Sequence, residues 1–213
     1  EAVVEEKKIE EMDVVFLMDR FGYAKTVDVA TYERNKEAAN TENRYILTCK
    51  NTDKICIFTN KGQMHLLKVL DLPYGKFRDK GTPIDNLSNY NSSEENFVYI
   101  TNLAAISRSQ VLFGTKSAML KVVDGSEFDV AKRTTAATKL NEGDELIFVQ
   151  ALTLEETLVM QSGVRGMKLC AGDSLTAIYL LNAEDSVDVE VKGKEVALNR
   201  LRTAGRDTKG TKR

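Results

Sequence analysis

The chain has 213 residues, 42% of them hydrophobic, which is enough for one large β domain or two small ones, and it has no eighteen-residue apolar run that would predict a membrane span. Its three scattered cysteines, Cys49, Cys56 and Cys170, form no CxxC pair, which argues against a disulfide framework or zinc site and favours the cytoplasm. Thirty basic residues face 32 acidic ones, so a nucleic-acid binder would have to segregate its positive charge onto one face.

Residues 1–12 are charged and lack the apolar region of a signal peptide, so we interpret them as an upstream linker or an artificial start of the chain. Strand–turn–strand hairpins then follow, each with period-2 alternation. Their strands and turns are VVFLMD, Arg20-Phe21-Gly22 and YAKTVDV; ICIFT, Asn60-Lys61-Gly62 and QMHLLKV; QVLFGT, Lys116-Ser117 and AMLKVV; a fourth that begins as TLVMQ at 157–161; and SVDVEV, Lys192-Gly193 and KEVALN.

A second element recurs after the hairpins, with the pattern x-K-L-x-x-G-D-x-L. It occurs at 138–146 and at 167–175, and residues 80–87 and 205–213 occupy equivalent places in the chain. We interpret the Gly-Asp pair as a turn between strands, preceded by a lysine within a strand. The Gly-Asp pairs lack the spacing of a calcium loop.

The spacing of these units predicts propeller-type blades of four strands. Gly22 and Gly62 are 40 residues apart, and Gly62 and Ser117 are 55 apart, close to the repeat lengths of such blades. Leu140 and Leu169 are only 29 residues apart, which leaves too few residues for the fourth blade. Because a half-built blade would expose open strand edges, we predict that further residues are absent between Ser162 and Gly163.

The sequence predicts an all-β fold without helices. Residues 32–43 have a helix-like composition but no apolar stripe, so we interpret them as a loop, and the polar residues 86–96 as a surface loop or turn. The absence of Trp argues against WD-type repeats.

Taken in order, the segments FLMDRFGYAKTVDVATYE, ICIFTNKGQMHLLKVLDLP, the KLxxGDEL element, GVRGMKL and NRLRTAGRDTKGTKR resemble the C-terminal domain of the A subunit of bacterial type IIA topoisomerases, DNA gyrase or topoisomerase IV. The resemblance covers nearly the whole chain. It implies a β-pinwheel over residues 13–213, a propeller-like disc of four-stranded blades that exchange strands, with about five blades represented and one incomplete.

The resemblance also implies partners and a location. The family's disc binds duplex DNA and works with the breakage-reunion domain of the same subunit, which carries the DNA-cleaving tyrosine, and with the ATPase (B) subunit. ATP and Mg²⁺ would be used by those other parts, and no cofactor is expected in this chain. The location implied is the bacterial cytoplasm, in association with the nucleoid.

One family signature is missing. Gyrase subunits carry Q-R-R-G-G-K-G shortly after a Tyr-Glu pair, but here Tyr32-Glu33 is followed by Arg34-Asn35-Lys36-Glu37-Ala38-Ala39. The resemblance therefore implies a topoisomerase IV-like subunit or a divergent gyrase with weak supercoiling activity. The basic segments 75–81 and 205–210 are only degenerate versions of the signature.

A disc that bends DNA needs cations spaced to follow phosphates, and it needs no base contacts. The candidates are basic residues that recur in the repeats: in the second strands, after the hairpins, or before the Gly-Asp turns. They are Lys25, Arg34, Lys36, Lys68, Lys76, Arg78, Lys80, Lys121, Lys132, Arg133, Lys139, Arg165, Lys168, Lys194, Arg200, Arg202, Arg206 and Lys209.

Two alternatives stand beside DNA binding. Lysines on the solvent face are ordinary for any sheet, and the sequence pI of about 5.7 is consistent with a propeller-like protein-interaction module. A propeller enzyme is disfavoured, because the only histidine, His65, has no clustered carboxylates beside it in the sequence, and no phosphate-loop pattern is present.

Overall fold

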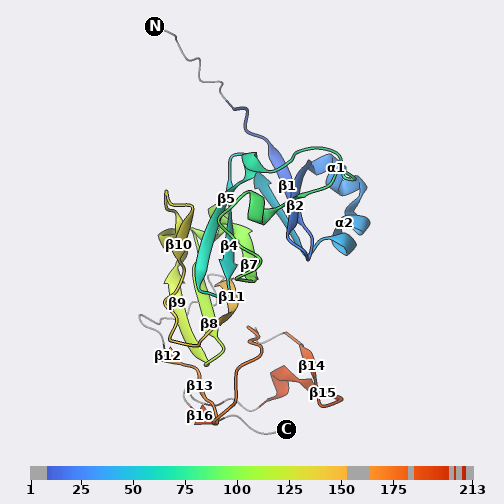
Figure 1. The fold of residues 1–213 in the computed structure, drawn as a ribbon. Helices are drawn as coiled ribbons and strands as arrows, with labels where there is room; N and C mark the ends of the chain where they lie inside the picture. The colour runs from blue at the N-terminus through green and yellow to red at the C-terminus, as the bar shows by residue number, and fades with distance from the viewer. Residues whose placement is uncertain (1–8, 153–163, 182–184, 202–203, 205–207, 210–213) are drawn as a thin grey trace.

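The computed structural model describes residues 9–152, 164–181, 185–201, 204 and 208–209 (Figure 1). Within them three four-stranded sheets follow one another along the chain, here called blades A, B and C. Each is built on one predicted hairpin, and these hairpins are confirmed: β1 (Asp13–Met18) with β2 (Tyr23–Asp28), β4 (Lys54–Thr59) with β5 (Gln63–Lys68), and β8 (Gln110–Thr115) with β9 (Met119–Asp124).

The outer strands complete the blades in a repeated way. After its hairpin the chain returns to the first hairpin strand, so that β3 (Tyr45–Lys50) pairs with β1, β7 (Phe97–Asn102) with β4, and β11 (Leu146–Leu152) with β8. Before it does so in blades B and C, it sends a short strand back to the preceding blade. β6 (Thr82–Pro83) pairs with β2, and β10 (Thr134–Ala136) pairs with β5.

The same exchange supplies the last strand of blade C, where β12 (Val164–Arg165) pairs with β9. Each blade is therefore finished by residues that belong to a later part of the chain, which ties neighbouring blades together. Beyond blade C the described residues form β13 (Met167–Lys168) paired with β16 (Thr208–Lys209), and the predicted hairpin of β14 (Asp188–Val191) with β15 (Lys194–Ala197). The fourth hairpin and the predicted break between Ser162 and Gly163 lie outside the described residues.

The recurring Gly-Asp element fastens each exchanged segment to a hairpin turn. Leu146, the last residue of its first copy, donates its backbone N–H to Asn60 O at 2.9 Å, and Leu175, at the same place in the second copy, donates to Lys116 O at 2.7 Å. Gly143 and Gly172 have φ of 76° and 81°, so the predicted turns are confirmed. Lys139, however, does not lie in a strand, because β10 ends at Ala136.

Apolar side chains fill the spaces between blades. Phe16 of blade A packs with Ile55, Ile57 and Ile100 of blade B. Phe58 of blade B packs edge-on against Phe113 of blade C and against Phe128, at ring-centroid distances of 5.8 and 5.2 Å. Since both faces of the central strands are covered, β1 and β4 are buried over five successive residues.

The prediction that the chain contains no helix, with residues 32–43 a loop, was wrong. Helices α1 (Val29–Arg34) and α2 (Lys36–Glu42) cover the outer face of blade A. Asp28 caps α1 by accepting a hydrogen bond from Thr31 N at 2.7 Å, and Ala39 of α2 packs against Val15 and Leu17. The break at Asn35 shifts the phase between two short helices, which is why no continuous apolar stripe is visible in the sequence.

The remaining elements are short. They are α3 (Leu103–Ile106) and the 3₁₀ turns η1 (Val69–Asp71), η2 (Ile84–Asn86), η3 (Gly125–Phe128) and η5 (Leu198–Arg200). Beyond η2, residues 87–96 form the predicted surface loop. None of the helices that the structure describes is long and apolar enough to cross a membrane.

Candidate nucleic-acid interface

Strand exchange places a basic segment along the outer edge of blade A. Thr26 of β2 donates its N–H to Pro73 O at 2.9 Å, and Gly75 N donates to Thr26 O at 3.3 Å, before β6 pairs with the start of β2. The chain between these contacts carries Lys76, Arg78 and Lys80, all exposed. Three of the predicted cations therefore lie on the perimeter of one blade.

The next blade repeats the arrangement. Leu66 of β5 donates its N–H to Arg133 O at 2.8 Å, immediately before β10 begins. Ala24 and Met64 are the second residues of β2 and β5, and they pair with Thr82 and Thr135 of the exchanged strands. Lys80 and Arg133 each lie two residues before these partners. They therefore occupy equivalent positions on the two blades. We call Lys76, Arg78, Lys80, Lys132 and Arg133 the perimeter cations.

The acidic neighbours leave these perimeter cations largely unneutralised. Arg133 Nη2 lies 3.9 Å from Asp71 Oδ2, with both side chains exposed, and such pairs contribute little. Asp79 uses its carboxylate to accept a hydrogen bond from the backbone of Lys76 at 2.8 Å, and not from its ammonium group. The side chains therefore remain available to an external polyanion.

Lys25 is placed differently from the perimeter cations. Its ammonium group donates to the backbone oxygens of Phe77 and Asp79, the latter at 3.0 Å, and lies 5.0 Å from the centroid of the Phe77 ring. Lys25 thus braces the segment that carries the perimeter cations, and its donors are already engaged with protein.

The second-strand lysines do not form one equivalent set. In the strand registers, Lys25, His65 and Lys121 occupy the same third position of β2, β5 and β9, whereas Lys68 lies at the end of β5, opposite Lys54. Lys194 is the first residue of β15. The four lysines that recur in the sequence therefore do not all occupy equivalent positions in the blades.

The helical region carries two of the predicted cations, Arg34 and Lys36. Lys36 Nζ lies 3.5 Å from Glu33 Oε2, and Arg34 Nη2 donates to Thr31 Oγ1 at 3.1 Å. Both side chains are exposed. Their side chains are partnered within the helical region, whose Tyr32 and Ala39 belong to the same hydrophobic cluster as Phe77 of the segment that carries the perimeter cations.

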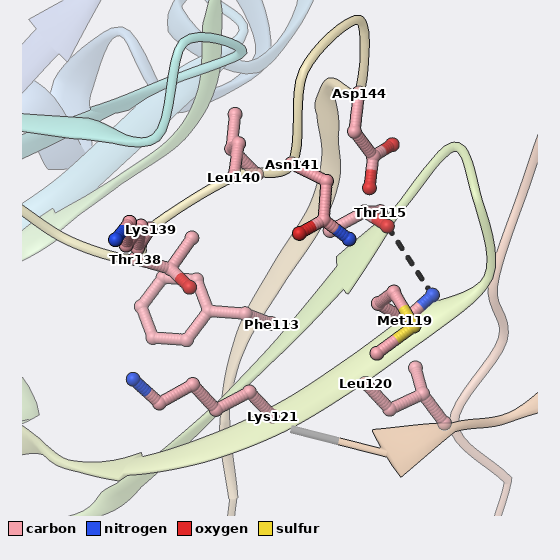
Figure 2. A pocket seen from close by; sticks show the side chains of 10 residues that line it. All are labelled: Phe113, Thr115, Met119, Leu120, Lys121, Thr138, Lys139, Leu140, Asn141 and Asp144. Carbon is pink, nitrogen blue, oxygen red and sulfur yellow. Dashed lines mark hydrogen bonds between the residues drawn. The ribbon is translucent and has the colours of Figure 1, made fainter. Parts of the chain in front are cut away.

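Lys121 and Lys139 line one pocket with a volume of about 100 Å³, at the junction of blades B and C (Figure 2). Arg165 of β12 lines a second hollow with Lys116, Ser117 and Asp173. Lys168, Lys194, Arg200 and Lys209 are exposed beyond blade C. Arg202 and Arg206 lie outside the described residues.

Sequence reasoning missed several basic residues. Arg20 stacks on Phe21 with its guanidinium carbon 4.6 Å from the ring centroid, and Arg44 lies 5.3 Å from the centroid of Tyr45. The sequence signal for these contacts is an arginine directly followed by an aromatic residue, as in Arg20-Phe21 and Arg44-Tyr45. Phe21 is 68% exposed and Tyr23 47% exposed, so the first hairpin turn presents aromatic surface.

The site shows no arrangement for chemistry within the described residues. No group of three or more His, Cys, Asp or Glu side chains there could hold a metal ion. His65 is buried between Thr134 and Glu95, its Nδ1 2.9 Å from Thr134 Oγ1 and its Nε2 2.7 Å from Glu95 Oε1.

Fold and site together define a propeller-like pinwheel domain with exchanged strands and a basic perimeter. The family model for the DNA gyrase C-terminal domain, a beta-propeller, matches residues 109–153, which run from the start of β8 to the end of β11 and so cover one repeat unit. The resemblance read from the sequence is thereby supported at the level of a single blade.

Whole-chain comparisons extend this likeness. The A subunit of DNA gyrase from Lawsonia intracellularis is 27% identical over 243 residues, covering 96% of this chain and 30% of that protein. A crystal structure of the C-terminal domain of DNA topoisomerase IV matches with a TM-score of 0.80 at 19% identity, over 96% of this chain and 73% of that one. The E. coli ParC C-terminal domain matches with a TM-score of 0.68 at 12% identity, over 93% of both chains.

The chain is thus similar to the C-terminal domains of type IIA topoisomerase A subunits, in sequence to gyrase A and in fold to topoisomerase IV. The predicted β-pinwheel class is confirmed. The chain spans 30% of the length of the gyrase relative, so the activity of that longer protein does not pass to this chain without further argument.

Proposed function

We propose that this chain is a non-catalytic domain that binds and bends duplex DNA for an ATP-dependent type IIA topoisomerase. The observation that carries the proposal is the strand exchange, which lays Lys76, Arg78 and Lys80 along one blade and Lys132 and Arg133 along the next. Repeated cations on successive blades suit a curved phosphate backbone and require no base contacts.

The energetics favour many contacts acting together. Bending a site of 20–30 bp costs of the order of 1–6 kcal/mol by smooth elastic estimates, so a single lysine cannot offset it. Each phosphate contact releases counterions and makes the fall of log K with log salt steeper by about 0.9, and the salt slope is given below as this steepness. With five such contacts, raising the salt concentration from 50 to 200 mM would lower the affinity by roughly 500-fold.

The similarity to gyrase A subunits supports placing the chain beside a breakage-reunion domain and an ATPase subunit, in the bacterial cytoplasm with the nucleoid. We assign it a topoisomerase IV-like role, because the residues after Tyr32-Glu33 do not form the gyrase signature. Under this assignment a holoenzyme that contains the chain decatenates DNA more efficiently than it introduces negative supercoils. Supercoiling comparable to that of a gyrase would reject the assignment.

DNA binding is tested by fluorescence anisotropy with a labelled 40-bp duplex over a salt series, and bending by energy transfer between dyes at the duplex ends. Arg78→Gln should reduce the salt slope by about 0.9. Lys50→Gln is the matched control, since its ammonium group is paired with Glu11 and Asp13 outside the proposed interface, and it should leave the slope unchanged. Equal slopes for wild type and Arg78→Gln would remove Arg78 from the interface.

A protein-interaction module is the second candidate. The net charge of −2 and the exposed side chains of Phe21 and Tyr23 favour it. The anisotropy experiment separates the two, because an interaction module shows no duplex binding even at low salt. Salt-sensitive binding that is independent of sequence supports the DNA-binding domain.

A further inference from the structure

The third position of each hairpin's second strand shows a contrast between blades. In blade A, Lys25 holds the exchanged segment through Phe77 O and Asp79 O. In blade B, His65 holds the exchanged strand through Thr134 Oγ1. In blade C the equivalent side chain, Lys121, is half-buried and has no hydrogen bond or ion pair among the residues that the structure describes; the chain just before β12, the counterpart of the segment that Lys25 holds, lies outside them.

Lys121 faces a pocket in which a second ammonium group lies. Lys139, from the segment between β10 and β11, lines the same pocket, and it too has no ion pair within the described ranges. In Figure 2 the two ammonium groups lie on the same side, with the Phe113 ring between them. Thr138 and Asn141 add a hydroxyl and an amide to the lining, and Leu120 and Leu140 add apolar surface.

The one carboxylate in the lining does not neutralise these lysines. Asp144 Oδ1 accepts hydrogen bonds from Ser117 N and Glu145 N, each at 2.9 Å, and in Figure 2 its carboxylate lies at the opposite end of the pocket. Two like charges beside an apolar wall repel each other more strongly than in water. An anion placed between them removes that repulsion and satisfies their donors.

We propose that this pocket is an anchor for one phosphate group of the DNA backbone, held jointly by Lys121 and Lys139 and oriented by Thr138 and Asn141. This inference rests on the proposed function. The volume of about 100 Å³ is sufficient for a phosphate group. DNA is the source that the structure favours, because Lys139 follows Lys132 and Arg133 along the same segment and is exposed as they are.

The test is duplex binding by the 213-residue chain, with Lys121→Gln, Lys139→Gln and the double variant. If both lysines hold one phosphate, each single variant lowers the salt slope by about 0.9, and the double variant loses no more than either one. The ratio of the wild-type affinity for duplex DNA to that of each variant should then fall by about 3.5-fold between 50 and 200 mM salt. Arginine at either position should restore the slope.

Lys50→Gln controls for loss of one positive charge, since Lys50 is paired with Glu11 and Asp13 and lies outside the proposed interface. Thermal unfolding of every variant shows whether it is folded. An additive loss in the double variant, with a slope change of about two, would overturn the shared phosphate. Slopes equal to that of Lys50→Gln, while wild type binds DNA, would overturn the anchor and leave the proposed function intact. Absence of duplex binding by the wild type itself would reject the proposed function.

Inorganic phosphate tests the source of the phosphate group. It is titrated into the free chain at constant ionic strength, with the methyl resonance of Met119 as the reporter, because Met119 lines the pocket. Saturable shifts in the wild type that vanish in Lys121→Gln, together with unchanged DNA slopes, would identify a free-phosphate site and overturn DNA as the ligand. Weak phosphate binding that competes with duplex DNA supports the proposal.

Discussion

His65 Nε2 lies 2.7 Å from Glu95 Oε1, and the two residues are 4% and 8% exposed. Glu95 Oε1 also accepts from Asn91 N at 3.1 Å, and His65 Nδ1 meets Thr134 Oγ1, so the pair joins β5, the loop before β7 and the exchanged strand β10. A buried polar network of this kind fixes the position of the exchanged strand β10 beside β5.

Removing His65 should destabilise the fold strongly. His65→Ala leaves the buried Glu95 side chain without its ring partner, and a buried polar group that loses its hydrogen bond costs about 1–3 kcal/mol. Urea unfolding followed by circular dichroism measures the change. The control is Lys36→Ala, which removes the exposed contact with Glu33 at 3.5 Å and should cost less than about 0.5 kcal/mol. Similar costs for the two variants would show that the buried network does not hold the blades together.

Acid should destabilise the fold through carboxylates that cap short helical turns. Hydrogen bonds from the hydroxyl and backbone N–H of Thr31 hold the pKa of Asp28 below its usual 3.8, and those from the backbone N–H and hydroxyl of Ser126 lower the pKa of Asp124. A carboxylate with a lowered pKa in the folded state binds its proton more readily in the unfolded chain. Its stabilising contribution is therefore complete above pH 3.8 and is lost as the pH falls through the folded-state pKa.

The measurement is the free energy of unfolding between about pH 2 and pH 6. In the double variant Asp28→Asn and Asp124→Asn, both caps can still accept hydrogen bonds but no longer titrate. Its stability should fall less steeply with acid than that of the wild type. Parallel curves would assign the acid sensitivity to other carboxylates.

The hairpins were predictable from the sequence because their signals are local. Period-2 alternation and a glycine at a turn lie within about fifteen residues, as in the turn at Gly62 with φ of 72°. The exchanged strands carry no such signal, since β6 and β12 have two residues each. Their existence followed only from the resemblance to a family that exchanges strands.

The helices and the buried network depended on contacts distant in sequence. Ala39 is buried because β1 provides its packing partners, and its neighbours in the sequence do not reveal this. His65 meets one partner 30 residues away and another 69 residues away. For the same reason the sequence could count lysines per strand but could not distinguish Lys25, which braces the exchanged segment, from Lys121, which has no ion pair within the described part of the chain.

Thiol reactivity should separate the cysteines by burial. Burial raises the pKa of Cys49 to about 11 and that of Cys56 to about 12, and both are enclosed in the core, whereas Cys170 is exposed. Because the thiolate is the reactive form, only Cys170 should react rapidly with a disulfide reagent at about pH 8 in the folded chain. All three should react in urea. Fast reaction of a second thiol in buffer would indicate that a blade opens readily, and Cys170→Ser identifies which thiol it is.

Gly62 and Gly143 form a matched pair for testing the contact between a hairpin turn and an exchanged segment. Both have positive φ, 72° and 76°, so alanine at either position costs about 1–2 kcal/mol of left-handed strain. A Cβ at Gly62 would lie 2.6 Å from Thr138 O, a backbone atom of the exchanged segment, whereas one at Gly143 meets nothing within 4 Å. Gly62→Ala must therefore also push the segment away from the turn.

The expected result is a larger loss of unfolding free energy for Gly62→Ala than for Gly143→Ala, by a further 1–3 kcal/mol, roughly the range for steric overpacking. Because Lys139 follows Thr138, Gly62→Ala should also weaken duplex binding, while Gly143→Ala leaves it unchanged. Equal destabilisation of the two variants would mean that the exchanged segment moves aside at no cost. The turn of one hairpin would then not determine where the next group of cations lies.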